Sequence, residues 1–137
     1  MERLKERLVI ARRVLSTLQE LLGLEAPSRV ERDAAIQRFE YTCEAVWKAA
    51  QRYLQDVEGI SVGSPKGSIR VSRDVGLLTD EQTVIGLEMI DDRNLTVHTY
   101  NEAVAEDIYS SLSAYADLFT AWLAAMAQRV KSQESND

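Results

Sequence analysis

The sequence predicts an all-α protein, an up-down antiparallel bundle of four long helices and one short helix. Apolar residues recur at gaps of three and four along most of the chain, and this spacing places them on one face of each helix. No stretch alternates apolar and polar residues with β-branched enrichment, so we expect no strands. The 137 residues, 45% hydrophobic and 28% charged, suit one globular domain. We assign that domain to residues 1–130 and a polar tail to residues 131–137.

The first two helices are predicted from their apolar stripes and their end signals. The first covers residues 4–22 and stops at Gly23, a residue typical of helix C-termini. The second begins at Ser28, because Glu31 follows at the spacing of a capping box, in which side chain and backbone bond reciprocally. We expect this second helix to run to about Asp56.

The short helix and the fourth helix follow a turn-rich break at residues 58–64. A serine followed by proline predicts a helix start, and the short helix is expected over residues 65–75, before a glycine. Thr79 and Gln82 form a second capping box, which opens a helix that extends through Ile90.

Residues 91–100 are expected to connect the fourth helix to the last one. Thr99 and Glu102 again have the capping-box spacing, so the last helix is predicted to start there. Tyr100 would then occupy the first helical position, and His98 would lie just outside the helix. Free N–H groups and the helix dipole attract phosphates to such an end.

Charge is distributed unevenly along the chain, whose net charge is −6. Residues 1–38 carry eight basic and six acidic side chains, whereas residues 76–137 carry three basic and eleven acidic ones. This balance argues against a general nucleic-acid coat protein. Any contact with RNA requires a local basic surface, which the first 75 residues best supply. Arg93 is the only basic side chain in residues 74–128.

The candidate functional site is the spacing Arg93-x4-His98-x-Tyr100, which contains the only histidine of the chain. An arginine, a histidine and a tyrosine beside a helix start are suited to handling a phosphate group. The alternative is that His98 and Tyr100 are partly buried polar residues in an ordinary connection.

This motif resembles the signature of the HEPN superfamily (higher eukaryotes and prokaryotes nucleotide-binding). The most specific run is DRNLTVHTYNE, and the segments QRFEYTCEAVWKAAQRYL and SPKGSIRVSRDVGLL extend the similarity. Together they resemble the branch called nucleotidyltransferase substrate-binding proteins, over roughly residues 30–125. The resemblance implies a HEPN-like helical bundle that forms homodimers and pairs with a small nucleotidyltransferase encoded nearby.

In many such pairs the helical protein is a metal-independent endoribonuclease toxin, and the nucleotidyltransferase is the antitoxin that adds nucleotide to the motif tyrosine. The resemblance therefore implies that Arg93 and His98 are catalytic and that Tyr100 is modified. Asn94 matches the polar residue that follows the arginine, and we count it among the candidate catalytic residues.

These residue types fit RNA cleavage. The 2′-OH of RNA attacks the adjacent phosphate once a base removes its proton, and histidine is the usual base near neutral pH. A guanidinium suits the charge that develops on the phosphate oxygens. We expect no metal and no cofactor, since the adjacent Asp91 and Asp92 on a helix point about 100° apart. They are expected to orient Arg93 or to lie in solvent.

A second hypothesis is a non-catalytic subunit that presents a substrate to the nucleotidyltransferase. One histidine per chain leaves the acid of the reaction unassigned unless a homodimer brings a second copy. The motif region also carries five carboxylates, which favour docking of a basic partner over RNA binding. They are Asp91, Asp92, Glu102, Glu106 and Asp107.

The sequence also predicts where the protein is located and that three further side chains are buried. No apolar run approaches the roughly 18 residues that span a bilayer, and the N-terminus lacks a signal-peptide pattern. Cys43 has no partner for an internal disulfide, and it lies on an apolar stripe. We therefore expect a cytoplasmic protein without membrane contact, with Cys43, Trp47 and Trp122 in the core.

Overall fold

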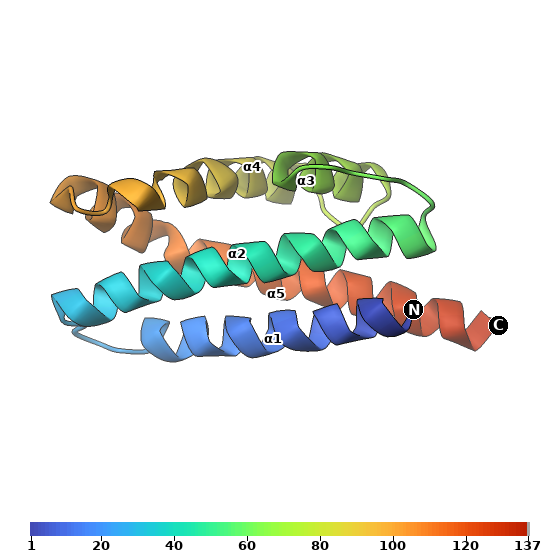
Figure 1. Ribbon diagram of the computed structural model, residues 1–137, viewed down its shortest axis with the longest axis horizontal. Helices are drawn as coiled ribbons and strands as arrows, with labels where there is room; N and C mark the ends of the chain where they lie inside the picture. The colour runs from blue at the N-terminus through green and yellow to red at the C-terminus, as the bar shows by residue number, and fades with distance from the viewer. Residues whose placement is uncertain (137) are drawn as a thin grey trace.

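The computed structural model describes residues 1–136 and confirms the all-α bundle. Its elements are α1 (Glu2–Leu22), α2 (Arg29–Val57), α3 (Pro65–Asp74), α4 (Asp80–Leu95), a 3-10 turn η1 (Thr96–His98) and α5 (Glu102–Asn136). Figure 1 shows α1, α2 and α5 side by side along the long axis, with α3 and α4 forming the opposite edge of the bundle. The two chain termini lie at the same end.

The predicted capping boxes of the second and fourth helices are confirmed. The Ser28 hydroxyl accepts from the Glu31 amide at 3.1 Å, and the Glu31 carboxylate accepts from the Ser28 amide at 2.8 Å. Thr79 and Gln82 make the same pair of bonds at 3.1 and 2.9 Å. Gly76 has a φ of +83°, a conformation that residues with a Cβ rarely adopt, which explains why the chain turns there after α3.

The predicted start of the last helix is wrong by two residues. The cap is Asn101, whose side-chain oxygen accepts from the amides of Ala103 at 3.0 Å and Val104 at 3.4 Å. Thr99 instead donates its hydroxyl to a carbonyl in the preceding turn. Thr99 and Asn101 are both residue types that cap helix N-termini, and Asn101 is the one that caps α5. Helix α5 therefore begins at Glu102.

The fourth helix is longer than predicted. Residues 91–95 continue α4, so Arg93 and Asn94 lie in its last turn rather than in a connection. Thr96 then donates its hydroxyl to the carbonyl of Arg93 at 2.7 Å, and the chain tightens into η1, which ends at His98. The connection between α4 and α5 is therefore one short turn.

The core is built from large side chains of α2 and α5. Phe39 is fully buried, and its ring stacks on Tyr115 at a centroid distance of 5.5 Å. Trp122 is fully buried, and its indole donates to Ser72 of α3 at 3.1 Å. Cys43 is buried as predicted, and burial raises the pKa of its thiol. Trp47 is only half-buried, so the prediction of a core position for it holds only in part.

The polar tail expected over residues 131–137 continues α5 as a helix to Asn136. Glu134 forms an ion pair with Lys5 of α1. Asp137, the last residue of the predicted tail, lies outside the described residues. Over residues 1–136, no helix is both long enough and apolar enough to cross a membrane.

Candidate functional site

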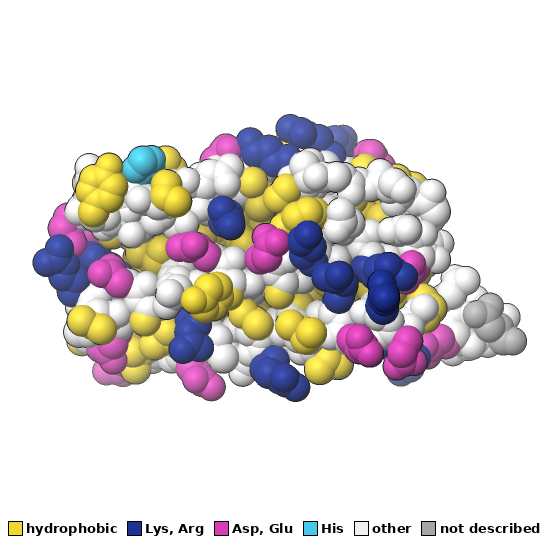
Figure 2. Space-filling view, viewed as in Figure 1, with side chains coloured by type: hydrophobic (Ala, Val, Ile, Leu, Met, Phe, Trp, Pro, Cys, Tyr) yellow, Lys and Arg dark blue, Asp and Glu magenta, His cyan; other side chains and the backbone are white. Residues whose placement is uncertain are grey.

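The Arg-His-Tyr motif lies at the end of the bundle where α4 turns into α5. Arg93 is half-buried and Asn94 is exposed, both in the last turn of α4. His98 closes η1 and is exposed, and Tyr100 follows it just before α5. Figure 2 shows this histidine, the cyan side chain, on the surface with hydrophobic side chains beside it.

His98 and Tyr100 contact each other. The Nδ1 atom of His98 lies 3.3 Å from the hydroxyl of Tyr100, and the rings meet edge to face with centroids 5.8 Å apart. Tyr100 is 81% exposed. Neither residue is buried, so the alternative of partly buried polar residues does not describe this turn. Both side chains are accessible to a macromolecular substrate or to a second enzyme.

Arg93 is the motif residue whose side chain is half-buried. Within residues 1–136 its guanidinium makes no hydrogen bond or ion pair, and no bond joins it to His98. Its charge is felt at Cys43 on α2, where it opposes the rise in the pKa of the thiol. A half-buried guanidinium without an internal carboxylate leaves its donors available for an anion.

The two aspartates before Arg93 do not orient it. Asp91 forms an ion pair with Lys66 of α3 at 2.7 Å, and Asp92 accepts a 2.5 Å hydrogen bond from the Tyr115 hydroxyl of α5. Burial and this bond to Asp92 raise the pKa of Tyr115. Of the two roles we expected, orienting Arg93 is therefore wrong, whereas exposure to solvent holds for Asp91, whose side chain is 63% exposed. Both aspartates instead fix the end of α4 to its neighbours.

A buried arginine, Arg32, holds the start of α5 against the start of α2. Its guanidinium binds both carboxylate oxygens of Glu102 at 2.7 and 2.9 Å, and it also donates to Glu106 at 2.7 Å and to Asp33 at 2.8 Å. Arg29, which is more exposed, contacts Glu102 at 2.9 Å. This cluster was not predicted from the sequence, because Glu102 and Glu106 lie 70 and 74 residues after Arg32.

These contacts change two expectations about the motif region. Four of the five carboxylates in that region already have partners within the chain, which weakens the hypothesis that they form a docking surface for a basic protein. They are Asp91, Asp92, Glu102 and Glu106. The start of α5 is also a poor phosphate site, because Asn101 occupies the amides of Ala103 and Val104. Any phosphate must be bound by side chains.

We predict an acid-sensitive contribution of Glu102 to stability. Hydrogen bonds from Arg32 lower the pKa of Glu102 to about 2, below its value in an unfolded chain. The unfolded state therefore binds the proton first, and this stabilisation is lost as the pH falls from about 5 towards 2. Thermal unfolding of wild type and Glu102→Gln at pH 6 and pH 3 measures it. The difference between their midpoints should shrink at pH 3, and an unchanged difference would contradict the assignment.

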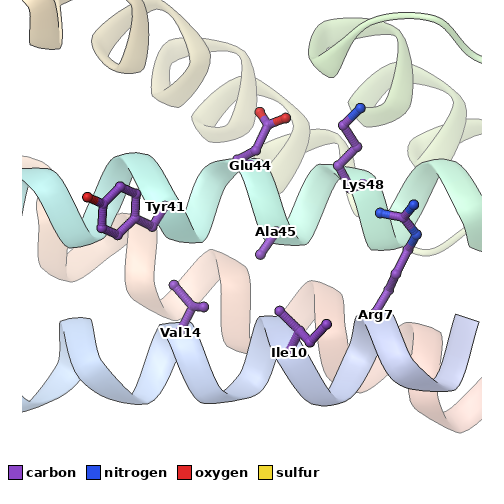
Figure 3. Close-up of a pocket in the computed structure, with 7 residues that line it drawn as sticks. All are labelled: Arg7, Ile10, Val14, Tyr41, Glu44, Ala45 and Lys48. Carbon is purple, nitrogen blue, oxygen red and sulfur yellow. The ribbon is translucent and has the colours of Figure 1, made fainter. Parts of the chain in front are cut away.

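A groove between α1 and α2 lies apart from the motif (Figure 3). Its volume is about 360 Å³, with Ile10 and Val14 on one wall and Ala45 on the other. Tyr41 lies at one end, and Arg7 and Lys48 lie at the other. The sequence signal was available, since Ile10 and Val14 form a second apolar row on the first helix, beside the buried stripe.

The described residues hold no group of three or more histidine, cysteine, aspartate or glutamate side chains placed to bind a metal ion.

The helical bundle has the fold of a solved HEPN toxin structure and of a substrate binding domain of a nucleotidyltransferase. Within this fold class, the chain belongs to the family described as nucleotidyltransferase substrate binding protein like, whose model matches residues 6–128. No curated protein matches the chain.

Solved structures support the fold assignment. A protein of Thermus thermophilus is 57% identical, with a TM-score of 0.83 over 85% of this chain and 98% of that one. A Haemophilus influenzae protein, described as having the fold of a substrate binding domain of a nucleotidyltransferase, is 21% identical. Its TM-score is 0.75, over 88% of this chain and 98% of that one.

A third structure is a tri-AMPylated Shewanella oneidensis HEPN toxin in complex with an MNT antitoxin. It is 16% identical and has a TM-score of 0.74, over 91% of this chain and 96% of that one. At this identity the similarity shows the fold alone.

Proposed function

We propose that this protein is the HEPN-type toxin of a toxin–antitoxin pair, a metal-independent endoribonuclease of the cytoplasm. One observation carries the proposal: His98 and Tyr100 are exposed and in contact on a turn that follows Arg93, whose guanidinium makes no bond or ion pair within residues 1–136. The partner is a small nucleotidyltransferase encoded nearby, which controls the toxin by modifying Tyr100. The family assignment and the fold shared with a toxin bound to its antitoxin support this pairing.

In the proposed reaction, His98 removes the proton from a ribose 2′-OH. The 2′-oxygen forms a bond to the adjacent phosphorus, the bond from phosphorus to the 5′-oxygen breaks, and a proton is delivered to that leaving oxygen. The products are a 2′,3′-cyclic phosphate and a 5′-hydroxyl. Arg93 stabilises the negative charge that develops on the phosphate oxygens, and Asn94 adds a neutral donor beside it.

One histidine per chain serves as either the base or the acid, so we propose that a homodimer supplies the second. The surface around His98 supports a contact between copies, because three large apolar side chains near it are exposed. They are Leu95, Val97 and Tyr100. Exposed apolar clusters of this kind are typical of interaction surfaces.

Control acts through the Tyr100 hydroxyl. In the transfer, the phenol oxygen forms a bond to the α-phosphorus of a nucleoside triphosphate, the bond to the β-phosphate breaks, and pyrophosphate leaves. The phosphate is then bound two residues from His98, where its charge can pair with Arg93. The modified site excludes the RNA phosphate both by its bulk and by competition for the same guanidinium.

The experiment for this control is an intact-mass measurement. The purified protein is incubated with the nucleotidyltransferase and ATP, and we expect a mass gain of one or more nucleotidyl groups and loss of RNA cleavage. Tyr100→Phe should gain no mass and should keep its activity, because it lacks only the acceptor oxygen. A gain of mass that persists in Tyr100→Phe would place the modification elsewhere.

The alternative function is a non-catalytic subunit that presents a substrate to the nucleotidyltransferase. The charge of residues 76–137, which carry three basic and eleven acidic side chains, favours it because such a surface repels RNA. The two functions differ in one readout. A non-catalytic subunit leaves RNA intact, even though Tyr100 or another group is still modified.

A further inference from the structure

The groove between α1 and α2 has the shape of a seat for a third helix. Arg7, Ile10 and Val14 follow one another along α1 at gaps of three and four, and Tyr41, Ala45 and Lys48 do the same along α2. Each row is therefore straight along its helix, and together they extend over about 10 Å. Paired rows of this kind accept the side chains of a helix packed between them.

The groove exposes apolar surface that no residue within 1–136 covers. Ile10 is 51% exposed and Tyr41 is 52% exposed, on helices whose opposite faces are fully buried. Ile10 also lines an adjoining hollow on the outer side of α1, together with Val9, which is equally exposed. The apolar area thus extends from the groove across α1, and Figure 2 shows hydrophobic side chains on this face, which also carries the histidine.

The charged side chains of the groove indicate which kind of ligand it binds. Arg7 and Lys48 lie at the same end of the groove (Figure 3). The Arg7 side chain extends from α1 across α2, whereas Lys48 points away from α1 and places its Nζ 4.7 Å from the centroid of the Trp47 ring. Arg7 makes no ion pair within residues 1–136. The one carboxylate of the groove, Glu44, already accepts a hydrogen bond from the Trp47 indole at 2.9 Å. The groove therefore carries two cations and one carboxylate, and Arg7 is the cation best placed to pair with an acidic ligand.

Two other occupants fit less well. If two copies packed groove to groove, the contact would gather four cations and two carboxylates, which is repulsive. A single-stranded RNA would find one aromatic ring, Tyr41, and a floor of aliphatic side chains that cannot stack with bases. An amphipathic helix can pack its apolar face on the aliphatic side chains of the groove and place acidic residues beside the cations at its end.

We propose that this groove binds an amphipathic helix of the partner nucleotidyltransferase, with apolar residues at gaps of three and four and acidic residues facing Arg7 and Lys48. The proposal rests on the pairing put forward above. A partner held there lies over the face that carries His98 and leaves the motif open, so the same partner can reach Tyr100.

The test measures the affinity of the purified nucleotidyltransferase for this protein and three variants. The double variant Arg7→Glu/Lys48→Glu should raise the Kd at least tenfold at 0.1 M NaCl, and less at 0.5 M, because salt screens charge pairs. Ile10→Asp should raise it about thirtyfold, as expected for an apolar anchor. Arg12→Glu makes the charge change of one of these two substitutions on the side of α1 that faces α5, and it should bind as wild type.

Each result is decisive. Groove variants that keep their melting temperature and RNA cleavage but escape the nucleotidyltransferase support the proposal. Unchanged binding by these variants overturns it and leaves the pairing intact, whereas no binding by wild type overturns the pairing as well. Groove variants that convert a dimer to a monomer identify a second copy as the occupant. Groove variants that lose RNA binding but keep normal partner binding identify RNA as the occupant. The loss of the dimer and the loss of RNA binding would each overturn the proposal.

Discussion

Replacing His98 by alanine should reduce RNA cleavage by about a thousandfold and abolish toxicity. The imidazole is the base that removes the 2′-OH proton, and a positioned base accelerates such a step by roughly a hundred- to ten-thousandfold. The substitution should leave the fold intact, because His98 is exposed and its one side-chain hydrogen bond within residues 1–136 is to Tyr100. Rates of cleavage of a labelled RNA by purified wild type and variant measure the loss.

Two variants make this result specific. Arg93→Lys should also cleave slowly, because an ammonium cannot bind two phosphate oxygens in one plane. Asp107→Asn removes a charge near the motif whose carboxylate has no bonding partner within residues 1–136, and it should cleave as wild type. Cleavage by His98→Ala at the wild-type rate would remove His98 from the mechanism.

Replacing Arg32 by methionine should destabilise the fold by about 2 kcal/mol, within the range for hydrogen bonds to charged groups. The loss of a fully buried ion pair costs more, but Glu102 and Glu106 are half-exposed and regain water when Arg32 is removed. For a domain of this size the melting temperature should fall by about 6 °C. Calorimetry measures the shift, and hydrogen exchange should quicken first at the start of α5.

Arg29→Met is the matched control for Arg32→Met. Arg29 contacts the same Glu102 at 2.9 Å, but its side chain is 71% exposed. Exposed ion pairs contribute little, so the melting temperature of Arg29→Met should stay within about 2 °C of wild type. Equal effects of the two substitutions would contradict the view that buried Arg32 fixes the junction.

Local signals explain why most of the fold was predictable from the sequence. Ser28 with Glu31, and Thr79 with Gln82, are close enough along the chain for their reciprocal bonds to be read from spacing alone. The same reasoning failed before α5, where Thr99 and Asn101 were both suitable caps. The capping preferences of the two residue types do not decide which of them caps the helix. The packing of the surrounding chain decides it.

The candidate site was predictable only in its residue types. The motif spacing identified Arg93, His98 and Tyr100, but the contact between His98 and Tyr100 depends on η1, a turn for which the sequence has no clear signal. The bonds of Arg32 to Glu102 join residues 70 positions apart, and the groove requires two helices to lie side by side. Such long-range pairings leave no spacing pattern in a single sequence.

The most direct test of the central claim is the cleavage of RNA by the purified, unmodified protein in excess EDTA. The account predicts cleavage that persists in EDTA and leaves 2′,3′-cyclic phosphate and 5′-hydroxyl ends, because His98 and Arg93 act on the ribose and phosphate without a metal. Intact RNA, or cleavage that requires a divalent metal, would contradict the proposed ribonuclease and favour the substrate-binding subunit.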